Sequence, residues 1–444
     1  MMPKKLKIKK GLNLNLIGSA TGEISELTDI SNEFAIIPDD FCGITPKLFK
    51  KEGDSIKAGE ALFYDKNHPE IHIVSPVSGT VSNIKRGERR KILAIIIKAY
   101  SGDSQKFIIP TDTSGIKTTL LSSGLWAMMR QRPYGIVPNP DTSPRDIFIS
   151  TFDSSPLSPD HTLLIDNNEA YFNKGVEILN KLTSGNVYIG CRKDYFLETD
   201  NSTSIIFEGP HPAGNIGTQI AAVKPLNKGE TVWTVDSDTV VRIGHLFTKG
   251  FVDFSCVVAI TGESVETPRF TKAIAGMALI DLLGQDFNEE NKRIISGNVL
   301  TGIRENIHGY LHFPYRQITV IPEIANDCEL LGWASLSHKK FSASRTFFSW
   351  LMPKSRKYHF DAKLNGGERA IIMAGEYDKV FPMDIYAEFL IKAIIARDIE
   401  KMEQLGIYEV VPEDFALCEF IDTSKLPLQK IVREGLDYIR KEMN

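Results

Sequence analysis

The 444-residue sequence has few cysteines, and none of them lies near another. The five are Cys42, Cys191, Cys256, Cys328 and Cys418. Zinc and iron–sulfur sites are built from closely spaced cysteines such as C-x-x-C, so the sequence holds no recognisable cluster of that kind. An odd number of scattered thiols also indicates a reducing compartment rather than a disulfide framework.

Long apolar runs and an excess of one charge are missing as well. A membrane-spanning helix needs about 20 consecutive apolar residues, whereas the densest apolar run, residues 92–97, is short enough to predict a buried strand. The basic start of the chain leads into residues 11–16, whose alternation of apolar and polar residues predicts a strand and not a signal peptide. The formal charge of −4 gives no overall attraction to nucleic acid.

The length predicts about three domains at roughly 150 residues each, and the pattern along the chain raises the number to four. We expect a multidomain α/β and β protein. An N-terminal strand segment, residues 1–40, is expected to join the core. Four units follow it: a barrel-sandwich hybrid (41–100), a Rossmann-like α/β domain (101–250), a β-grasp domain (251–335) and a mainly helical C-terminal domain (336–444).

The first unit carries two motifs separated by a short interval. The pattern G-D-x-I-x-x-G-x-x-L at 53–62 and S-P-V-x-G-x-V at 75–81 resembles the barrel-sandwich hybrid fold of lipoyl and biotinyl carrier domains. Such domains display a modified lysine on a hairpin between these motifs, where Lys66 lies. A lipoyl or biotinyl arm on Lys66 is therefore one alternative. Asp65 and Asn67 stand where a biotinyl site has methionines, which favours an ordinary solvated lysine.

The second unit alternates strands and helices, which predicts a parallel sheet. The expected strands are 146–151, 187–191 and 204–207, and a helix is expected at 168–179. The loop after the third strand carries Gly209, Gly214 and Gly217, a partial match to the G-x-G-x-x-G loop of dinucleotide-binding proteins. Pro210 and Pro212 remove two of the N–H donors that such a loop needs. We expect packing or partner contact here more than nucleotide binding.

The third and fourth units are read from strand and helix signals. Strands at 256–261, 293–302 and 317–321, with a short helix at 277–284, resemble the β-grasp module of soluble-ligand-binding (SLBB) domains. Farther on, Pro382 is expected to open a helix that ends at Gly406 and packs one face into the core. That face is expected to hold Tyr386, Phe389, Leu390, Ala393 and Ile394. Pro427 is expected to open the last helix.

Metal and nucleophile motifs are not recognisable. His68 and His72 are four residues apart, as are His308 and His312, the spacing with which a helix can present two ligands to one metal. Pro69 and Gly309 argue against helix at both places. We therefore expect no metal site and no catalytic residue in this chain.

A segment rich in cations and aromatic rings, residues 338–360, contains no Asp or Glu. Such a composition suits a membrane surface or an acidic partner, and least of all nucleic acid in a chain of this overall charge. Solvated charges around a small aromatic core are an equally good interpretation. The candidate docking residues are Lys339, Lys340, Arg345, Phe347, Phe348 and Trp350.

Motifs along the whole chain resemble one family, the A subunits of the sodium-translocating NADH:quinone oxidoreductases. They include R-Q-R-P at 130–133, G-P-H-P-A-G at 209–214 and G-H-L-F-T-K-G at 244–250. Further matching stretches are residues 10–14, 53–54, 65–66, 75–81, 86–87, 125–126, 232–234, 293–297, 381–385 and 417–418.

The resemblance implies a peripheral protein on the cytoplasmic face of the bacterial inner membrane, docked on the membrane-embedded B subunit of the same complex. In that complex, electrons pass from NADH through flavins and iron–sulfur centres to ubiquinone while sodium ions are exported. The related flavin-bearing subunits of complex I and of the Rnf complex have a glycine-rich flavin loop and clustered cysteines, both missing here. We expect a cofactor-free scaffold with no catalytic site of its own. A flavin or iron–sulfur carrier of the Rnf type is the alternative, and contact with ubiquinone stays open.

Overall fold

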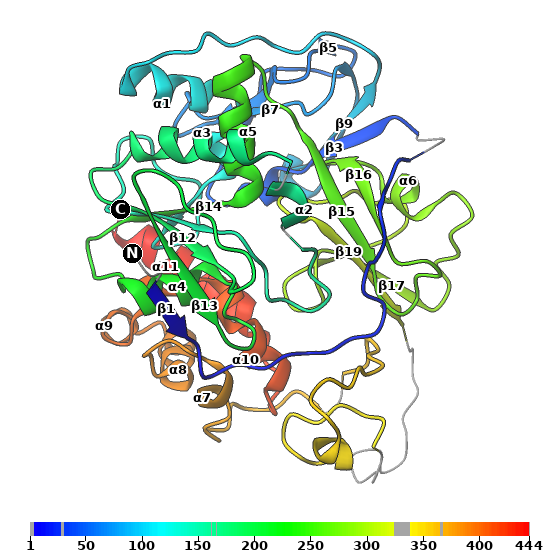
Figure 1. Ribbon diagram of the computed structural model, residues 1–444, viewed down its shortest axis with the longest axis vertical. Helices are drawn as coiled ribbons and strands as arrows, with labels where there is room; N and C mark the ends of the chain where they lie inside the picture. Colours follow the sequence, from blue (N-terminus) through cyan, green and yellow to red (C-terminus); the bar gives the residue numbers. More distant parts are fainter. Residues whose placement is uncertain are drawn as a thin grey trace.

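The computed structural model describes residues 4–27, 31–160, 162–165, 167–323, 338–364 and 367–443. Within these ranges the strands form four sheets, of six, six, four and three strands. The N-terminal segment adds a strand to three of them: β1 (Lys4–Lys7), β2 (Ile24–Ser25) and β3 (Glu33–Ile36). Figure 1 shows this blue segment running from β1 at the lower left to the opposite side of the molecule. The described residues of this segment are thus paired with strands from three different units.

Two small sheets make up the first unit. One has the order β3-β9-β8-β5 and the other β4-β6-β7. Their remaining strands are β4 (Pro46–Leu48), β5 (Ser55–Ile56), β6 (Ala61–Asp65), β7 (His72–Val74), β8 (Gly79–Arg86) and β9 (Ile92–Ala99). The apolar run at 92–97 lies within β9, as predicted. Leu62, Phe63, Val81 and Ile97 are fully buried between the sheets, and their burial supplies the main stabilisation of this small unit.

A mostly parallel six-stranded sheet, in the order β1-β13-β12-β11-β14-β10, forms the second unit. Every neighbouring pair is parallel except β10 with β14. The strands after β1 are β10 (Arg130–Arg132), β11 (Ile147–Ser150), β12 (Val187–Cys191), β13 (Ser202–Glu208) and β14 (Val232–Asp236). The expected strands at 146–151, 187–191 and 204–207 are confirmed as β11, β12 and β13.

Helices cover this sheet on both faces. On one face lie α3 (Glu169–Asn180) and α5 (Ser237–Lys249), and α4 (Ile216–Val223) lies on the other (Figure 1). Helix α1 (Thr113–Ser122) packs farther out, beside β7, and the short α2 (Thr162–Ile165) packs on α5. Successive side chains of β11 point to opposite faces of the sheet. Ile147 and Ile149 belong to the main core, whereas Phe148 packs with Ile220 of α4 on the other face. Helices α3 and α5 approach backbone to backbone, because a Cβ on Gly244 would collide with the Tyr171 carbonyl oxygen.

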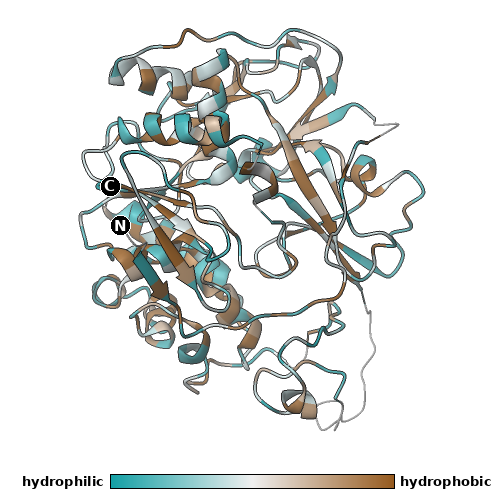
Figure 2. Ribbon diagram, viewed as in Figure 1, coloured by the Kyte–Doolittle hydropathy of each residue, from teal (hydrophilic) through white to brown (hydrophobic). Residues whose placement is uncertain are grey.

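The third unit is the second six-stranded sheet, ordered β18-β17-β19-β15-β16-β2. Its later strands are β15 (Ser255–Thr261), β16 (Arg269–Ile274), β17 (Lys292–Ser296), β18 (Ile303–Glu305) and β19 (Gln317–Pro322), with the short helix α6 (Leu279–Leu283). The long strands β15 and β19 are apolar along most of their length (Figure 2). The prediction of a strand over 293–302 is too long at its end, since β17 ends at Ser296. Gly297 adopts a φ of +106° and turns the chain there.

The C-terminal unit is helical, as expected, but its first helix was wrongly placed. Instead of one helix from Pro382 to Gly406, the chain forms α8 (Ala387–Ala396) and α9 (Ile399–Gln404), separated by Arg397 with a φ of 55°. Tyr386 and Phe389 are 72% and 52% exposed, so they do not lie on the core face. The remaining helices are α7 (Tyr377–Val380), α10 (Ala416–Ile421) and α11 (Leu428–Met443), the last beginning directly after Pro427 as predicted.

The strand expected at residues 11–16 does not form. Leu14 and Leu16 are buried, which explains the alternation, yet the backbone there makes only one isolated bridge within the described ranges, from Leu16 to Tyr358. Gly11 has a φ of +144° and lies against the His211 carbonyl, and the Leu12 N–H donates to that same carbonyl oxygen at 2.8 Å. The segment is therefore fixed by the glycine-rich loop that follows β13.

Candidate functional site

The glycine-rich loop at 209–217 connects β13 to α4, where a dinucleotide-binding domain holds its pyrophosphate. Two of its backbone donors are bonded to this chain's own groups. The Gly214 N–H donates to Ser154 Oγ at 2.8 Å, and the His211 N–H donates to Asn13 Oδ1 at 2.8 Å. A Cβ on Gly214 would lie 2.5 Å from the Ser154 backbone nitrogen. The space that a phosphate would need beside this glycine is thus filled by the segment after β11.

An ion pair covers the remaining part of the same loop. A Cβ on Gly217 would collide with Asp414 Oδ1 and would lie 2.5 Å from Arg132 Nη2. Arg132 Nη1 donates to Asp414 Oδ2 at 2.8 Å, and the two side chains are only 4% and 1% exposed. Asp414 belongs to η7 (Pro412–Phe415) of the C-terminal unit, so a carboxylate of this chain stands at the start of α4. Gly209 in turn packs on the Ile8 carbonyl oxygen, which occupies the place of a Cβ there.

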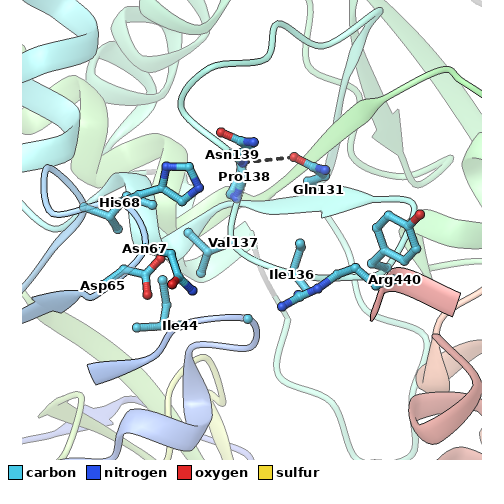
Figure 3. A pocket seen from close by; sticks show the side chains of 13 residues that line it. Ile44, Asp65, Asn67, His68, Gln131, Ile136, Val137, Pro138, Asn139 and Arg440 are labelled. Carbon is cyan, nitrogen blue, oxygen red and sulfur yellow. Dashed lines mark hydrogen bonds between the residues drawn. The ribbon is translucent and has the colours of Figure 1, made fainter. Parts of the chain in front are cut away.

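Lys66 follows β6 directly and is exposed on the turn that leads to β7. Its N–H donates to the Thr45 carbonyl oxygen at 2.8 Å, which holds the turn against the chain before β4. The neighbouring residues Asp65, Asn67 and His68 line a cavity beside this turn, together with the segment 131–139 and Arg440 of α11 (Figure 3). No single sequence motif marked this cavity, because its walls come from distant parts of the chain.

The two histidine pairs do not form metal sites in the structure. His68 lies on the β6–β7 turn, whereas His72 is in β7 with its ring against Phe49. His308 is exposed, and His312 is buried between Asp40 and Glu305, which its ring nitrogens contact at 2.6 and 2.9 Å. Among the residues that the structure describes, no group of three or more His, Cys, Asp or Glu side chains could hold a metal ion.

The basic aromatic segment forms the short helix η5 (Phe348–Leu351), with irregular chain on either side. Phe348, Trp350 and Leu351 are 46%, 50% and 61% exposed. Its cations lie over its own rings, since Lys340 Nζ is 5.7 Å from the centre of Phe347 and the Arg345 guanidinium carbon is 5.5 Å from that of Trp350. Lys339 and Arg345 are exposed, while Lys340 and Phe347 are half-buried. The segment therefore presents cations and apolar surface side by side.

Three family models match the chain. The NqrA N-terminal barrel-sandwich hybrid domain covers residues 6–100, the NqrA second alpha/beta domain covers 111–252, and the NQRA C-terminal domain covers 257–305. These matches confirm a barrel-sandwich hybrid followed by an α/β domain and a third domain of this family.

Curated proteins are similar to this chain over nearly its whole length. The A subunit of the Na(+)-translocating NADH-quinone reductase of Yersinia pestis bv. Antiqua (strain Angola) is 34% identical over 98% of this chain and 100% of its own length. The protein of the same name from Neisseria meningitidis serogroup C is 33% identical over the same shares. Among solved structures, a chain of NAD+-reducing NiFe hydrogenase aligns with a TM-score of 0.36 and 12% identity, covering 75% of this chain and 62% of that one. That similarity is too weak to bear on the fold.

Proposed function

The chain belongs to the NqrA family, the A subunits of the Na(+)-translocating NADH-quinone reductases, and we propose that it serves such a pump as a scaffold without a cofactor or catalytic site of its own. The pump oxidises NADH, reduces ubiquinone and exports sodium ions, and this chain contributes as one of its subunits. NADH, flavin and iron–sulfur chemistry then belongs to the other subunits.

The observation that carries the scaffold proposal is the occupied loop between β13 and α4. Where a flavin- or nucleotide-binding relative would need free N–H groups and a positive field, this chain places Ser154 and the Asp414 carboxylate. The Arg132–Asp414 ion pair fills the space beside Gly217, so a phosphate has no room there. The scattered cysteines likewise offer no cluster ligands.

Cofactor and mass analysis of the purified full-length chain tests this proposal. We expect no stoichiometric flavin or iron–sulfur absorbance, and an intact mass equal to that of the sequence. A mass increment on Lys66 would instead support the lipoyl or biotinyl carrier, and bound flavin or iron would support an Rnf-type electron carrier. Neither alternative is favoured by the family to which the chain belongs.

Docking on a membrane partner is the second part of the proposal. No helix in the described ranges is long and apolar enough to cross a bilayer. We place the chain on the cytoplasmic face of the inner membrane, bound to the membrane-embedded B subunit. The basic aromatic segment, residues 338–360, supports this placement, because exposed aromatic and aliphatic side chains beside cations suit a protein surface at the level of anionic headgroups.

Charge reversal in this segment is expected to weaken assembly. Each cation near an anionic membrane surface contributes about 1 kcal/mol, so the triple variant Lys339→Glu, Lys340→Glu, Arg345→Glu should lower retention on the membrane subunits at least tenfold. Co-purification from membranes measures this. The matched control reverses Lys51, Arg89 and Arg90, three exposed cations of the barrel-sandwich unit. Equal retention of both triple variants would rule out docking through this segment.

The finer fold assignments are part of the same proposal. The parallel run β13-β12-β11-β14 with helices on both faces supports a Rossmann-like origin of the α/β domain. The antiparallel pairs around the parallel pair β15–β19, with α6 beside them, support a β-grasp module for the third unit. As a rigid scaffold, the chain would shape access of quinone to the complex.

A further inference from the structure

A cavity of about 390 Å³ lies where four parts of the chain meet (Figure 3). Its walls are residues 43–44 before β4, the end of β6 with the turn that follows it, the segment 131–139 that begins in β10, and the last turn of α11. Small-molecule sites occupy roughly 300–1,000 Å³, so this volume suits a small organic ligand. The glycine-rich loop and the basic aromatic segment contribute no wall, which separates this cavity from the surfaces described above.

Two opposite charges line the cavity without pairing with each other. Asp65 is only 2% exposed, and its Oδ1 accepts the Thr45 N–H at 2.8 Å, while Oδ2 accepts no hydrogen bond from the described residues. On the other side, the Arg440 side chain extends from α11 toward Ile136 (Figure 3) and makes no hydrogen bond or ion pair with any residue that the structure describes. A carboxylate and a guanidinium thus face one space, each without a counter-ion from the described part of the chain.

Between the charged groups the walls carry both apolar and polar side chains. Ile44 and Ile71 contribute from the barrel-sandwich unit, and Ile136 and Val137 contribute from the segment after β10. Amide groups of Asn67 and Asn139 lie among them. A ligand that fits these walls has a short middle part and two polar ends of opposite charge.

We propose that this cavity binds a small zwitterion, with an ammonium group against Asp65 and a carboxylate or phosphate group against Arg440. A guanidinium holds either anion through two parallel N–H···O bonds, which fixes the orientation of the ligand. A ligand with only one charge leaves the opposite protein charge unpaired in a partly desolvated space, and that cost discriminates against it. The site is independent of the scaffold role.

Calorimetric titration of the full-length chain with a series of ω-amino acids, from glycine to 6-aminohexanoate, tests the proposal. Each compound is compared with the amine and the acid of the same chain length, for example 4-aminobutanoate with butylamine and butanoate. O-phosphoethanolamine tests a phosphate end. We expect one chain length to bind with a stoichiometry of one, and its singly charged counterparts to bind at least about tenfold more weakly.

Two variants distinguish a binding role from a structural one. With Arg440→Gln, the ω-amino acid should no longer bind more tightly than the amine of the same length. With Asp65→Asn, it should no longer bind more tightly than the acid. Asn at position 65 keeps an oxygen that can accept the Thr45 N–H, and Lys441→Gln, on the exposed neighbour in α11, is the control with unchanged binding. If Asp65→Asn fails to fold, the Arg440→Gln comparison with amines decides alone. Binding by none of the zwitterions, or equal binding by singly charged compounds, would overturn the proposal.

Discussion

Replacing Arg132 with Gln is expected to lower the free energy of unfolding by about 3–5 kcal/mol, because it leaves the Asp414 carboxylate buried without a counter-ion. The two side chains are 4% and 1% exposed and join at 2.8 Å. Arg132 also donates to the Glu409 carbonyl oxygen at 2.8 Å, so the same change removes a second contact to the C-terminal unit. Burial opposes the charge on Arg132, but the carboxylates of Asp414 and Glu413 outweigh it and raise the pKa of Arg132.

Chemical denaturation of four proteins measures this effect: wild type, Arg132→Gln, Asp414→Asn and the double variant. The double variant should lose less stability than the sum of the single variants, because neither charge is then left unpaired. Arg192→Gln is the control, because Arg192 is 39% exposed beside Asp160 and Asp194. This substitution should lower the free energy of unfolding by at most about 1 kcal/mol. A loss below about 1 kcal/mol in Arg132→Gln would show that the pair does not hold the two units together.

Local patterns in the sequence were enough to place several of the longer strands and the last helix. Residues 92–97 and 187–191 are apolar runs of strand length, and Pro427 marks the start of α11, so each signal lies within a few neighbouring residues. The errors occur where tertiary contacts decide. In residues 11–16 apolar and polar side chains alternate as in a strand, but the backbone is held by the loop around His211 instead of by a sheet. The helix expected from Pro382 is interrupted at Arg397.

The candidate sites were harder to predict, because their partners are far apart in sequence. The glycines of the 209–217 loop were visible, but Arg132 and Asp414, which fill the space beside Gly217, are 282 residues apart. The charges that line the cavity, Asp65 and Arg440, likewise come from opposite ends of the chain. Burial of a charged pair leaves no local periodicity, so only the fold reveals it. Conversely, the spacing of His308 and His312 fits a metal-binding pair, but the ring of His312 is hydrogen-bonded to Asp40, which comes from another part of the chain.

The buried cluster of Asp40, His312 and Glu305 predicts a pH-dependent stability. The His312 Nδ1–H donates to Asp40 Oδ1 at 2.6 Å and its Nε2–H donates to Glu305 Oε1 at 2.9 Å, an arrangement that requires the protonated ring. Burial lowers the pKa of His312, but its hydrogen bonds to both carboxylates outweigh burial and raise the pKa from 6.5 to about 9. The imidazolium therefore ties η1 (Pro38–Asp40) to the third unit at neutral pH.

Because the pKa is higher in the folded chain than in the unfolded one, the stabilisation is fully present below pH 6.5 and is lost as the pH rises through 9. A shift of this size corresponds to about 3 kcal/mol. The free energy of unfolding should thus fall from pH 6 to pH 9.5 in wild type by about 3 kcal/mol more than in His312→Gln. His359→Gln, at an exposed histidine beside Glu263, should keep the wild-type profile. Parallel pH profiles for wild type and His312→Gln would mean that His312 is neutral in the folded chain. The contact between η1 and the third unit would then depend on the stacked rings of Phe41 and Phe313, whose centres are 5.6 Å apart, and not on charge.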